Sequence, residues 1–181
     1  MAYNPTRYPI VVGFFLWWGD KMKVKVRRMC EVDALKILVW HYAPPYSWYD
    51  FDQTNSDFQA LLKDHYYCVI GKEGELIGFF CYGPAAQVSL GVEQGFYQDQ
   101  GYLDIGLGMN PLLCGKGYGA RFFLIGMDYA QHRFGFSKFR LTVASFNARA
   151  IKMYLKVGFV EIGRFTVSSY EFIVMIYEKE S

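Results

Sequence analysis

The segment NPLLCGKGYGARFF, residues 110–123, places glycines at positions 115, 117 and 119 directly before an apolar, helix-like run. Glycine loses more backbone freedom on folding than any other residue, so three of them in one short loop need a reason. A loop between a strand and a helix N-terminus presents unpaired N–H groups and the positive end of the helix dipole, which together favour an anion. Without Cβ atoms in the way, a phosphate could reach these amides. The alternative is a turn whose glycines serve only helix–strand packing.

Three kinds of phosphate-binding loop can be compared with this segment. The P-loop pattern GxxxxGK[ST] does not occur in the chain. The dinucleotide fingerprint GxGxxG differs from the GxGxG spacing found here, and no suitable acidic residue ends a following strand. The third kind, a pyrophosphate loop of the pattern (R/Q)xxGxG/A, fits from Cys114 to Gly119 in all but its first position.

A second segment, NARAIKMYLKVGF, begins about 28 residues after the last of these glycines. Asn147 and Tyr154 are seven positions apart in it, so on a helix they point in nearly the same direction. Two structural alternatives stay open at this point. Asn147 could be only a helix N-cap, and Tyr154 only an amphipathic core residue.

The run from about Leu103 to Phe159 resembles the core of GNAT-type N-acetyltransferases, which bind acetyl-CoA through such a loop and follow it with N-x-x-A-x-x-x-Y-x-x-x-G-F. The resemblance implies a GNAT-like acyl-CoA N-acyltransferase fold, a mixed α/β domain with a central, mostly antiparallel sheet flanked by helices. It also implies transfer of an acetyl group from acetyl-CoA to a primary amine by direct attack. A non-catalytic acyl-CoA-binding or sensing module on the same fold is the alternative.

The resemblance assigns roles to particular residues. The end of the strand before the loop, near Met109, would pair with the pantetheine arm, and Asn147 would contact the cofactor. Tyr154 would lie near the sulfur and protonate the departing thiolate. Acetyl-CoA is therefore the expected co-substrate, and no metal is expected. Backbone amides of six loop residues would cradle the CoA pyrophosphate: Cys114, Gly115, Lys116, Gly117, Tyr118 and Gly119.

The sequence departs from the family pattern at three sites. One is Gly106 and Gly108, inside the strand before the loop, which indicate a bulge or a close backbone approach. Cys114 stands where the family usually has Arg or Gln, and a thiol at a helix N-terminus would have a lowered pKa. Some members carry a Glu on the strand before the second motif, but Thr142 occupies that position here and cannot act as a base. Asp104 is the candidate base, because its apolar neighbours favour partial burial and a raised pKa. A water chain is the alternative proton acceptor.

Acceptor selection is expected from two less regular segments, the loop WHYAPPYSWYDFD and the connection over residues 84–100. Aromatic rings of the loop could flank an amine by cation–π contact, and Asp50 or Asp52 could attract it. For any one of these residues, a solvated loop whose aromatics cover the core is an equally good explanation. The acceptor is expected to be a small-molecule or peptide amine, with its identity left open.

The composition supports one domain with a large core, because 52% of the 181 residues are hydrophobic and 19% are aromatic. The net charge of +2, without a Lys/Arg block, argues against nucleic acid as the main partner. Four scattered cysteines without a CxxC pair, and three histidines at no metal-ligand spacing, favour reduced thiols in a cytoplasmic protein. The oligomeric state, including a homodimer, stays open.

The chain is expected to divide into an N-terminal extension, residues 1–21, and an acetyltransferase domain, residues 22–181. The apolar run PIVVGFFLWWG within the extension is too short to span a bilayer, and no membrane association is expected. Met22 is a candidate natural start, because MKVKVRRM reads as an ordinary first strand. Helices are expected over 31–40, 56–63, 118–134 and 147–157, and further strands over 66–83 (a hairpin), 102–109, 139–144, 159–168 and 170–179.

Overall fold

The computed structural model describes residues 15–18, 22–63 and 65–178 of the chain. Its strands are β1 (Phe15–Trp18), β2 (Met22–Arg28), β3 (Tyr66–Ile70), β4 (Leu76–Tyr82), β5 (Leu103–Met109), β6 (Lys138–Ala144), β7 (Val160–Val167) and β8 (Tyr170–Glu178). Its α-helices are α1 (Glu31–Leu38), α2 (Asn55–Leu61), α3 (Ser89–Glu93), α4 (Gly119–Phe134) and α5 (Ala148–Val157). The described residues also form the short 3₁₀ helices η2 (Tyr46–Tyr49), η3 (Gly83–Ala86) and η4 (Pro111–Leu113).

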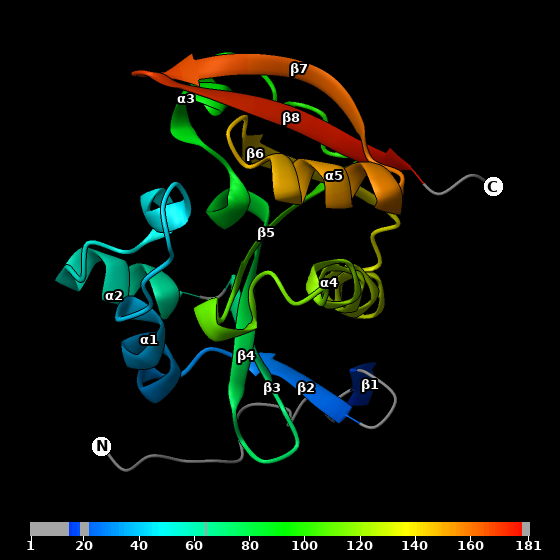
Figure 1. Ribbon diagram of the computed structural model, residues 1–181. Helices are drawn as coiled ribbons and strands as arrows, with labels where there is room; N and C mark the ends of the chain where they lie inside the picture. Colours follow the sequence, from blue (N-terminus) through cyan, green and yellow to red (C-terminus); the bar gives the residue numbers. More distant parts are fainter. Residues whose placement is uncertain (1–14, 19–21, 64, 179–181) are drawn as a thin grey trace, which may run out of the picture.

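The strands form a single sheet in the order β1-β2-β3-β4-β5-β6-β8-β7 (Figure 1). Neighbouring strands are antiparallel except β5 and β6, which run parallel. Those two strands pair only at Leu103 with Phe139 and at Asp104 with Arg140. Beyond this point β5 continues to pair with β4 as far as Met109, and β6 continues with β8. The centre of the sheet therefore opens between β5 and β6.

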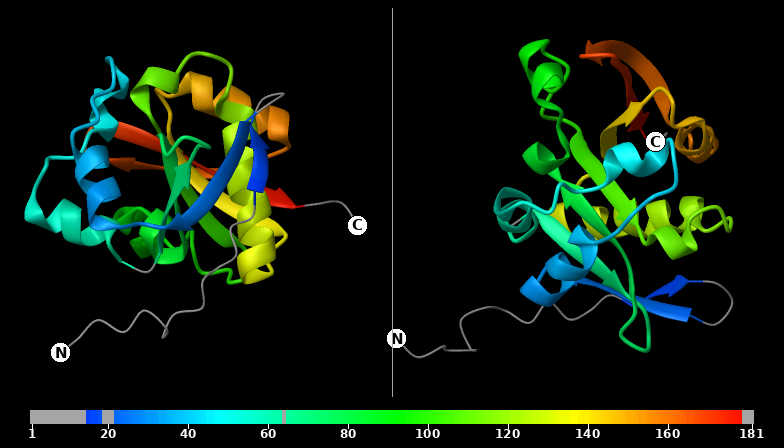
Figure 2. Two further views of the ribbon diagram at one scale, coloured as in Figure 1. Left: turned by 90° about the horizontal axis from the view of Figure 1, so that it is seen from below. Right: turned by 60° about the vertical axis from the view of Figure 1, so that its left-hand side comes forward.

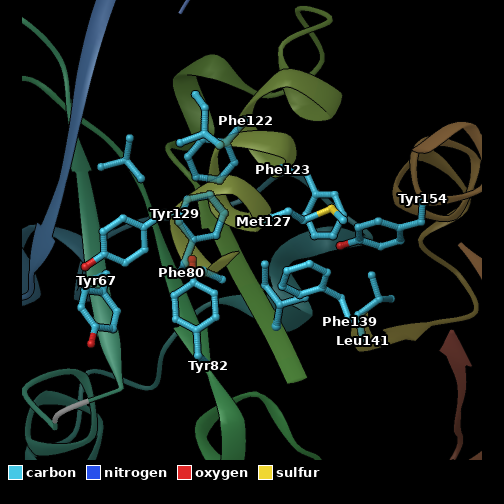
Figure 3. Close-up of a cluster of buried hydrophobic side chains, with 14 of the residues drawn as sticks. Tyr67, Phe80, Tyr82, Phe122, Phe123, Met127, Tyr129, Phe139, Leu141 and Tyr154 are labelled. Carbon is cyan, nitrogen blue, oxygen red and sulfur yellow. The ribbon is translucent and has the colours of Figure 1, made fainter. Parts of the chain in front are cut away.

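Helices cover both faces of the sheet (Figures 1 and 2). Helices α1 and α2 lie on one side of strands β2 to β5, and α4 lies on the other. The main core lies under α4 and α5, where Phe80 stacks on Phe122 with 4.6 Å between ring centroids (Figure 3). Helix α4 approaches the sheet closely because Gly126 has no side chain: a Cβ there would lie 2.4 Å from the ring of Phe80. This packing fixes the start of α4 relative to the open centre of the sheet.

The mixed α/β fold predicted from the sequence is confirmed, and so are the two helices next to the motifs. Helix α4 ends at Gly135, which has φ +79°, and α5 ends at Gly158, which has φ +106°. Both glycines therefore provide the left-handed C-terminal stops that the sequence predicts. The connection over residues 84–100, which the sequence pattern left without regular structure, contains η3 and the short helix α3.

Strand β1 lies inside the predicted N-terminal extension and forms an edge of the sheet. It pairs antiparallel with β2, from Phe15 opposite Lys25 to Trp18 opposite Met22. The rest of the extension, residues 1–14 and 19–21, falls outside the described residues. Within the described ranges, no helix is both long enough and apolar enough to cross a membrane.

A chain that begins at Met22 is expected to fold and to bind CoA with unchanged affinity. It loses the edge strand β1, whereas the residues that line the central cavity described below begin only at Trp40. Thermal unfolding followed by circular dichroism, together with calorimetric titration of CoA, tests this. Loss of cooperative unfolding in the shortened chain would show that β1 is an essential part of the sheet.

Candidate active site

A cavity of about 720 Å³ occupies the opening between β5 and β6. One wall is the strand β5 from Ile105 to Met109, and a second is the glycine loop that leads into α4. The third wall is α5, and the fourth is the aromatic loop from Trp40 to Phe51. The cavity thus joins both sequence motifs to the segment that was expected to select the acceptor.

The free edge of β5 presents backbone groups to this cavity. The amide of Asn110 donates to the carbonyl of Ile77 at 2.8 Å, so Asn110 faces β4. The N–H and C=O of successive strand residues point alternately to the two edges of a strand. The backbone groups of Leu107 and Met109 therefore point to the edge of β5 that no longer pairs with β6. The hydroxyl of Tyr42 donates to the Met109 carbonyl at 3.0 Å, in agreement with this direction. The predicted position of Met109 beside an extended ligand is geometrically possible.

The glycine loop has room for a ligand directly in front of its backbone. Gly115 and Gly117 have φ +76° and +83°, which side chains disfavour. Gly119 has no such constraint, and a Cβ built on it or on Gly117 would meet nothing within 4 Å. Helix α4 begins at Gly119, and its N-cap residue Tyr118 makes no side-chain capping bond. An uncapped helix start with open space before it fits a phosphate group.

Three cations of α5 line the cavity: Arg149, Lys152 and Lys156. Arg149 lies close to the loop, since its Nη1 would be 3.8 Å from a Cβ on Gly115. The guanidinium is held in place by the ring of Tyr46, 4.3 Å from its centroid. The loop residue Lys116 is exposed and does not line the cavity. Positive charge therefore accompanies the uncapped helix start, as a pyrophosphate site requires.

The expected low pKa of Cys114 is a prediction that the structure contradicts. Cys114 follows η4 and lies five residues before α4 begins, so its sulfur is not at the helix N-terminus. Burial raises the pKa of its thiol, and the nearby Arg149 offsets only part of this. The thiol side chain lines the cavity without the character of a reactive thiolate.

Asn147 and Tyr154 both reach the cavity, and each also has a structural role. The Asn147 side-chain oxygen accepts the amide of Ala150 at 3.2 Å as the N-cap of α5, and its nitrogen donates to the Tyr49 hydroxyl at 3.3 Å. The Tyr154 ring packs against Phe123, with centroids 5.0 Å apart (Figure 3). Burial raises the pKa of Tyr154 well above that of an ordinary tyrosine, so its phenol stays protonated at neutral pH.

Asp104 does not line the cavity but lies in a buried ion pair with Arg140. Its two oxygens accept from Arg140 Nε at 2.6 Å and Nη2 at 3.0 Å, and one of them also accepts from Gln87 Nε2 at 2.6 Å. A carboxylate with both oxygens engaged in this way is poorly placed to take a proton from a substrate. The role of Asp104 as the base stays a prediction, and this geometry argues against it.

Thr142, in contrast, does line the cavity, next to the point where β5 and β6 separate. Its hydroxyl is hydrogen-bonded to the hydroxyl of Tyr97 at 2.6 Å, and the Tyr97 oxygen also accepts the amide of Val88. The connection over residues 84–100 is thereby attached to β6. Thr142 therefore supports the cavity wall at this point.

Gly106 and Gly108 are explained by close packing rather than by a bulge in β5. The β4–β5 pairing runs in regular register from Gly78 opposite Met109 to Tyr82 opposite Ile105. A Cβ on Gly106 would lie 2.6 Å from the sulfur of Cys81, and one on Gly108 would lie 2.3 Å from the ring of Phe79. Of the two interpretations suggested by glycine in a strand, close approach is the correct one.

The aromatic loop contributes one carboxylate to the cavity, that of Asp50, whereas Asp52 does not line it. Asp50 Oδ1 accepts the amide of Tyr42 at 2.9 Å, and Oδ2 pairs with Nδ1 of His41 at 2.5 Å. Tyr42 therefore connects Asp50 to Met109 at the end of β5. The sequence alone gave no reason to single out Tyr42, since its partner Met109 is 67 positions away.

Within the described part of the chain, no group of three or more His, Cys, Asp or Glu side chains is arranged to hold a metal ion.

The fold is that of acetyltransferases of known structure. An acetyltransferase of the GNAT family from Bacillus anthracis superposes with a TM-score of 0.65 at 14% identity, covering 86% of this chain and 94% of that one. An aminoglycoside acetyltransferase in complex with coenzyme A gives 0.64 at 23% identity, covering 86% and 95%. Mutant forms of the spermidine/spermine N-acetyltransferase from Vibrio cholerae give 0.58 at 20% identity, covering 85% and 93%.

A match between the sequence and a family profile identifies the family of acetyltransferases to which the chain belongs. The profile described as the acetyltransferase (GNAT) family matches residues 33–159, and the chain belongs to this family. The resemblance inferred from the two motifs is thereby confirmed. A search of curated protein sequences finds no match. Family membership supports acetyl transfer as the activity and leaves the acceptor open.

Proposed function

We propose that the protein transfers an acetyl group from acetyl-CoA to a primary amine, by direct attack of the neutral amine on the thioester. The observation that carries this proposal is the single cavity shared by the glycine loop, the free edge of β5 and Tyr154. The loop and the cations of α5 would hold the pyrophosphate, and Leu107 and Met109 would pair with the pantetheine arm. This arrangement would direct the thioester toward Tyr154 and the acceptor side of the cavity.

Tyr154 is proposed to stabilise the departing thiolate. Its raised pKa keeps the phenol protonated, so that it can donate a hydrogen bond as negative charge develops on the sulfur. A backbone N–H at the free edge of β5, near Met109, would stabilise the oxyanion formed during attack. These roles use groups that face one cavity and need no metal ion.

The amine must lose a proton before or during attack. A free lysine-type amine with a pKa of about 10.4 is neutral in roughly one molecule per 2,500 at pH 7, so deprotonation limits the rate unless the site assists it. Both oxygens of Asp104 are engaged by Arg140 and Gln87. A chain of water molecules leading from the cavity is therefore the proposed proton acceptor.

The decisive experiment is an acetyl-CoA-dependent screen of amine acceptors, with release of free thiol as the readout. Thiol release that requires an amine and scales with its concentration would establish the transferase. Tight acetyl-CoA binding without thiol release for any amine would favour the alternative, a non-catalytic acyl-CoA-binding module.

The variant Gly119→Val tests the phosphate site. We expect CoA affinity to fall by roughly 10- to 100-fold, the effect of losing one hydrogen bond to a charged group, because the new side chain fills the space before the loop. The fold should be kept, since a Cβ at Gly119 meets no atom within 4 Å. Calorimetric titration with CoA is the measurement.

The matched control is Leu124→Val, which also places a β-branched residue in α4 but at a position that is 50% exposed and away from the loop. It should bind CoA normally. Unchanged CoA affinity in Gly119→Val would remove the glycine loop from the proposed site.

A further inference from the structure

We propose that the acceptor is a monoamine carrying a flat, apolar body, such as an arylalkylamine, rather than a polyamine or an aminoglycoside. This inference rests on the proposed function and specifies its acceptor. It follows from the charges of the cavity lining and from the aromatic surface that the loop from Trp40 to Phe51 contributes.

The described residues that line the cavity carry three cations and one carboxylate. The cations Arg149, Lys152 and Lys156 belong to α5, and Arg149 lies close to the glycine loop assigned to the CoA phosphates. Among the described lining residues, the only carboxylate is Asp50, on the acceptor side. One ammonium group can pair with Asp50, whereas further ammonium groups on the same molecule would enter the cavity without a partner. Burying an unpaired charge is costly, so the cavity disfavours polycations.

Asp50 is fixed in position as an anchor for that one ammonium group. Its side chain is only 19% exposed, and Tyr42 and His41 each occupy one oxygen. A carboxylate has about four acceptor positions, so others remain for a substrate. His41 is itself 79% exposed and faces outward. Through the Tyr42 hydroxyl bonded to Met109, Asp50 is also coupled to the end of the proposed cofactor strand.

The remaining surface on this side consists mainly of aromatic rings. Trp40 stacks on Phe79 with centroids 6.1 Å apart, and Phe51 lies 6.2 Å from the same ring. Such rings bind flat apolar groups by stacking and flank an ammonium group by cation–π contact. They offer few hydrogen bonds to the many hydroxyl groups of a sugar. Six aromatic side chains from the aromatic loop and β4 line the cavity: Trp40, Tyr42, Tyr46, Tyr49, Phe51 and Phe79.

The test compares 2-phenylethylamine, spermidine and kanamycin as acceptors at saturating acetyl-CoA, with thiol release as the readout. We expect kcat/KM for 2-phenylethylamine to exceed that for either polycation by at least about tenfold. A higher value for spermidine or kanamycin would overturn the inference and leave the transferase proposal standing.

The variant Asp50→Asn tests the anchor, and Asp52→Asn is the matched control, two positions away and outside the cavity lining. Asp50→Asn should raise KM for 2-phenylethylamine by about tenfold, with KM for acetyl-CoA unchanged, because a charge-assisted hydrogen bond becomes a neutral one. Asp52→Asn should behave as the unaltered protein. Equal KM values in the two variants would overturn the inference.

A binding measurement separates failure of this inference from failure of the proposed function. Calorimetry with the CoA complex measures 2-phenylethylamine affinity without turnover. Binding that Asp50→Asn weakens, without thiol release for any amine of the screen, would refute the transferase and support the acceptor site. Absence of 2-phenylethylamine binding would overturn the inference.

Discussion

Replacement of Tyr154 by Phe should lower turnover by about 10²- to 10⁴-fold, the usual contribution of acid–base catalysis, with CoA affinity nearly unchanged. The substitution removes one hydroxyl and keeps the ring that packs against Phe123 and Phe159. Steady-state kinetics with the amine found in the screen, and calorimetry with CoA, measure the two effects. A variant with normal turnover would leave Tyr154 as a core residue only.

The matched control is Tyr67→Phe, which removes a hydroxyl from the same hydrophobic cluster at a position that does not line the cavity (Figure 3). It should keep full turnover. The pH profile gives a second check. Because burial raises the pKa of Tyr154, the catalytically useful protonated form persists to higher pH than in an exposed tyrosine. The rate of the unaltered protein should therefore show no decline from loss of this proton below about pH 10.

The parts of the site that could be predicted from the sequence are those encoded by short-range spacing. The glycine loop, its following helix and the pair Asn147 and Tyr154 each lie within one local segment, and helical periodicity fixes how their residues project. The C-terminal stops at Gly135 and Gly158 follow from the same local chemistry. Local patterns thus locate the two motifs and, through the family resemblance, the fold.

The parts that could not be predicted depend on contacts between distant segments. Asp104 and Arg140 are 36 positions apart, and strand alternation alone does not reveal which face of β5 a residue occupies or what pairs with it. The same limit applies to Asp50 and Asp52, which are equally acidic and two positions apart in one loop. The lowered pKa predicted for the Cys114 thiol is wrong because η4 separates Cys114 from the helix start and burial raises the pKa, and η4 has no clear sequence signal.

The variant Asp104→Asn should destabilise the protein by about 3 kcal/mol or more, the usual result of removing one partner from a buried ion pair. The side chains of Asp104 and Arg140 are only 4% and 3% exposed, so the amide would leave a guanidinium charge buried without its counter-ion. The carbonyls of Tyr97 and Asp99 still accept from Arg140, which places the loss toward the lower end of the usual range. Urea unfolding measures the free energy of unfolding directly.

Replacing both partners, as Asp104→Leu with Arg140→Met, should recover much of that stability, because no unpaired charge remains. The exposed pair of Arg164 and Glu161 supplies the matched control: Glu161→Gln should leave stability almost unchanged. The pH–rate profile of Asp104→Asn decides between the two roles of Asp104. If it is the catalytic base, the rate of the folded variant recovers as pH approaches the amine pKa. If it supports the point where β5 and β6 separate, stability falls and the pH–rate profile of the folded fraction keeps its shape.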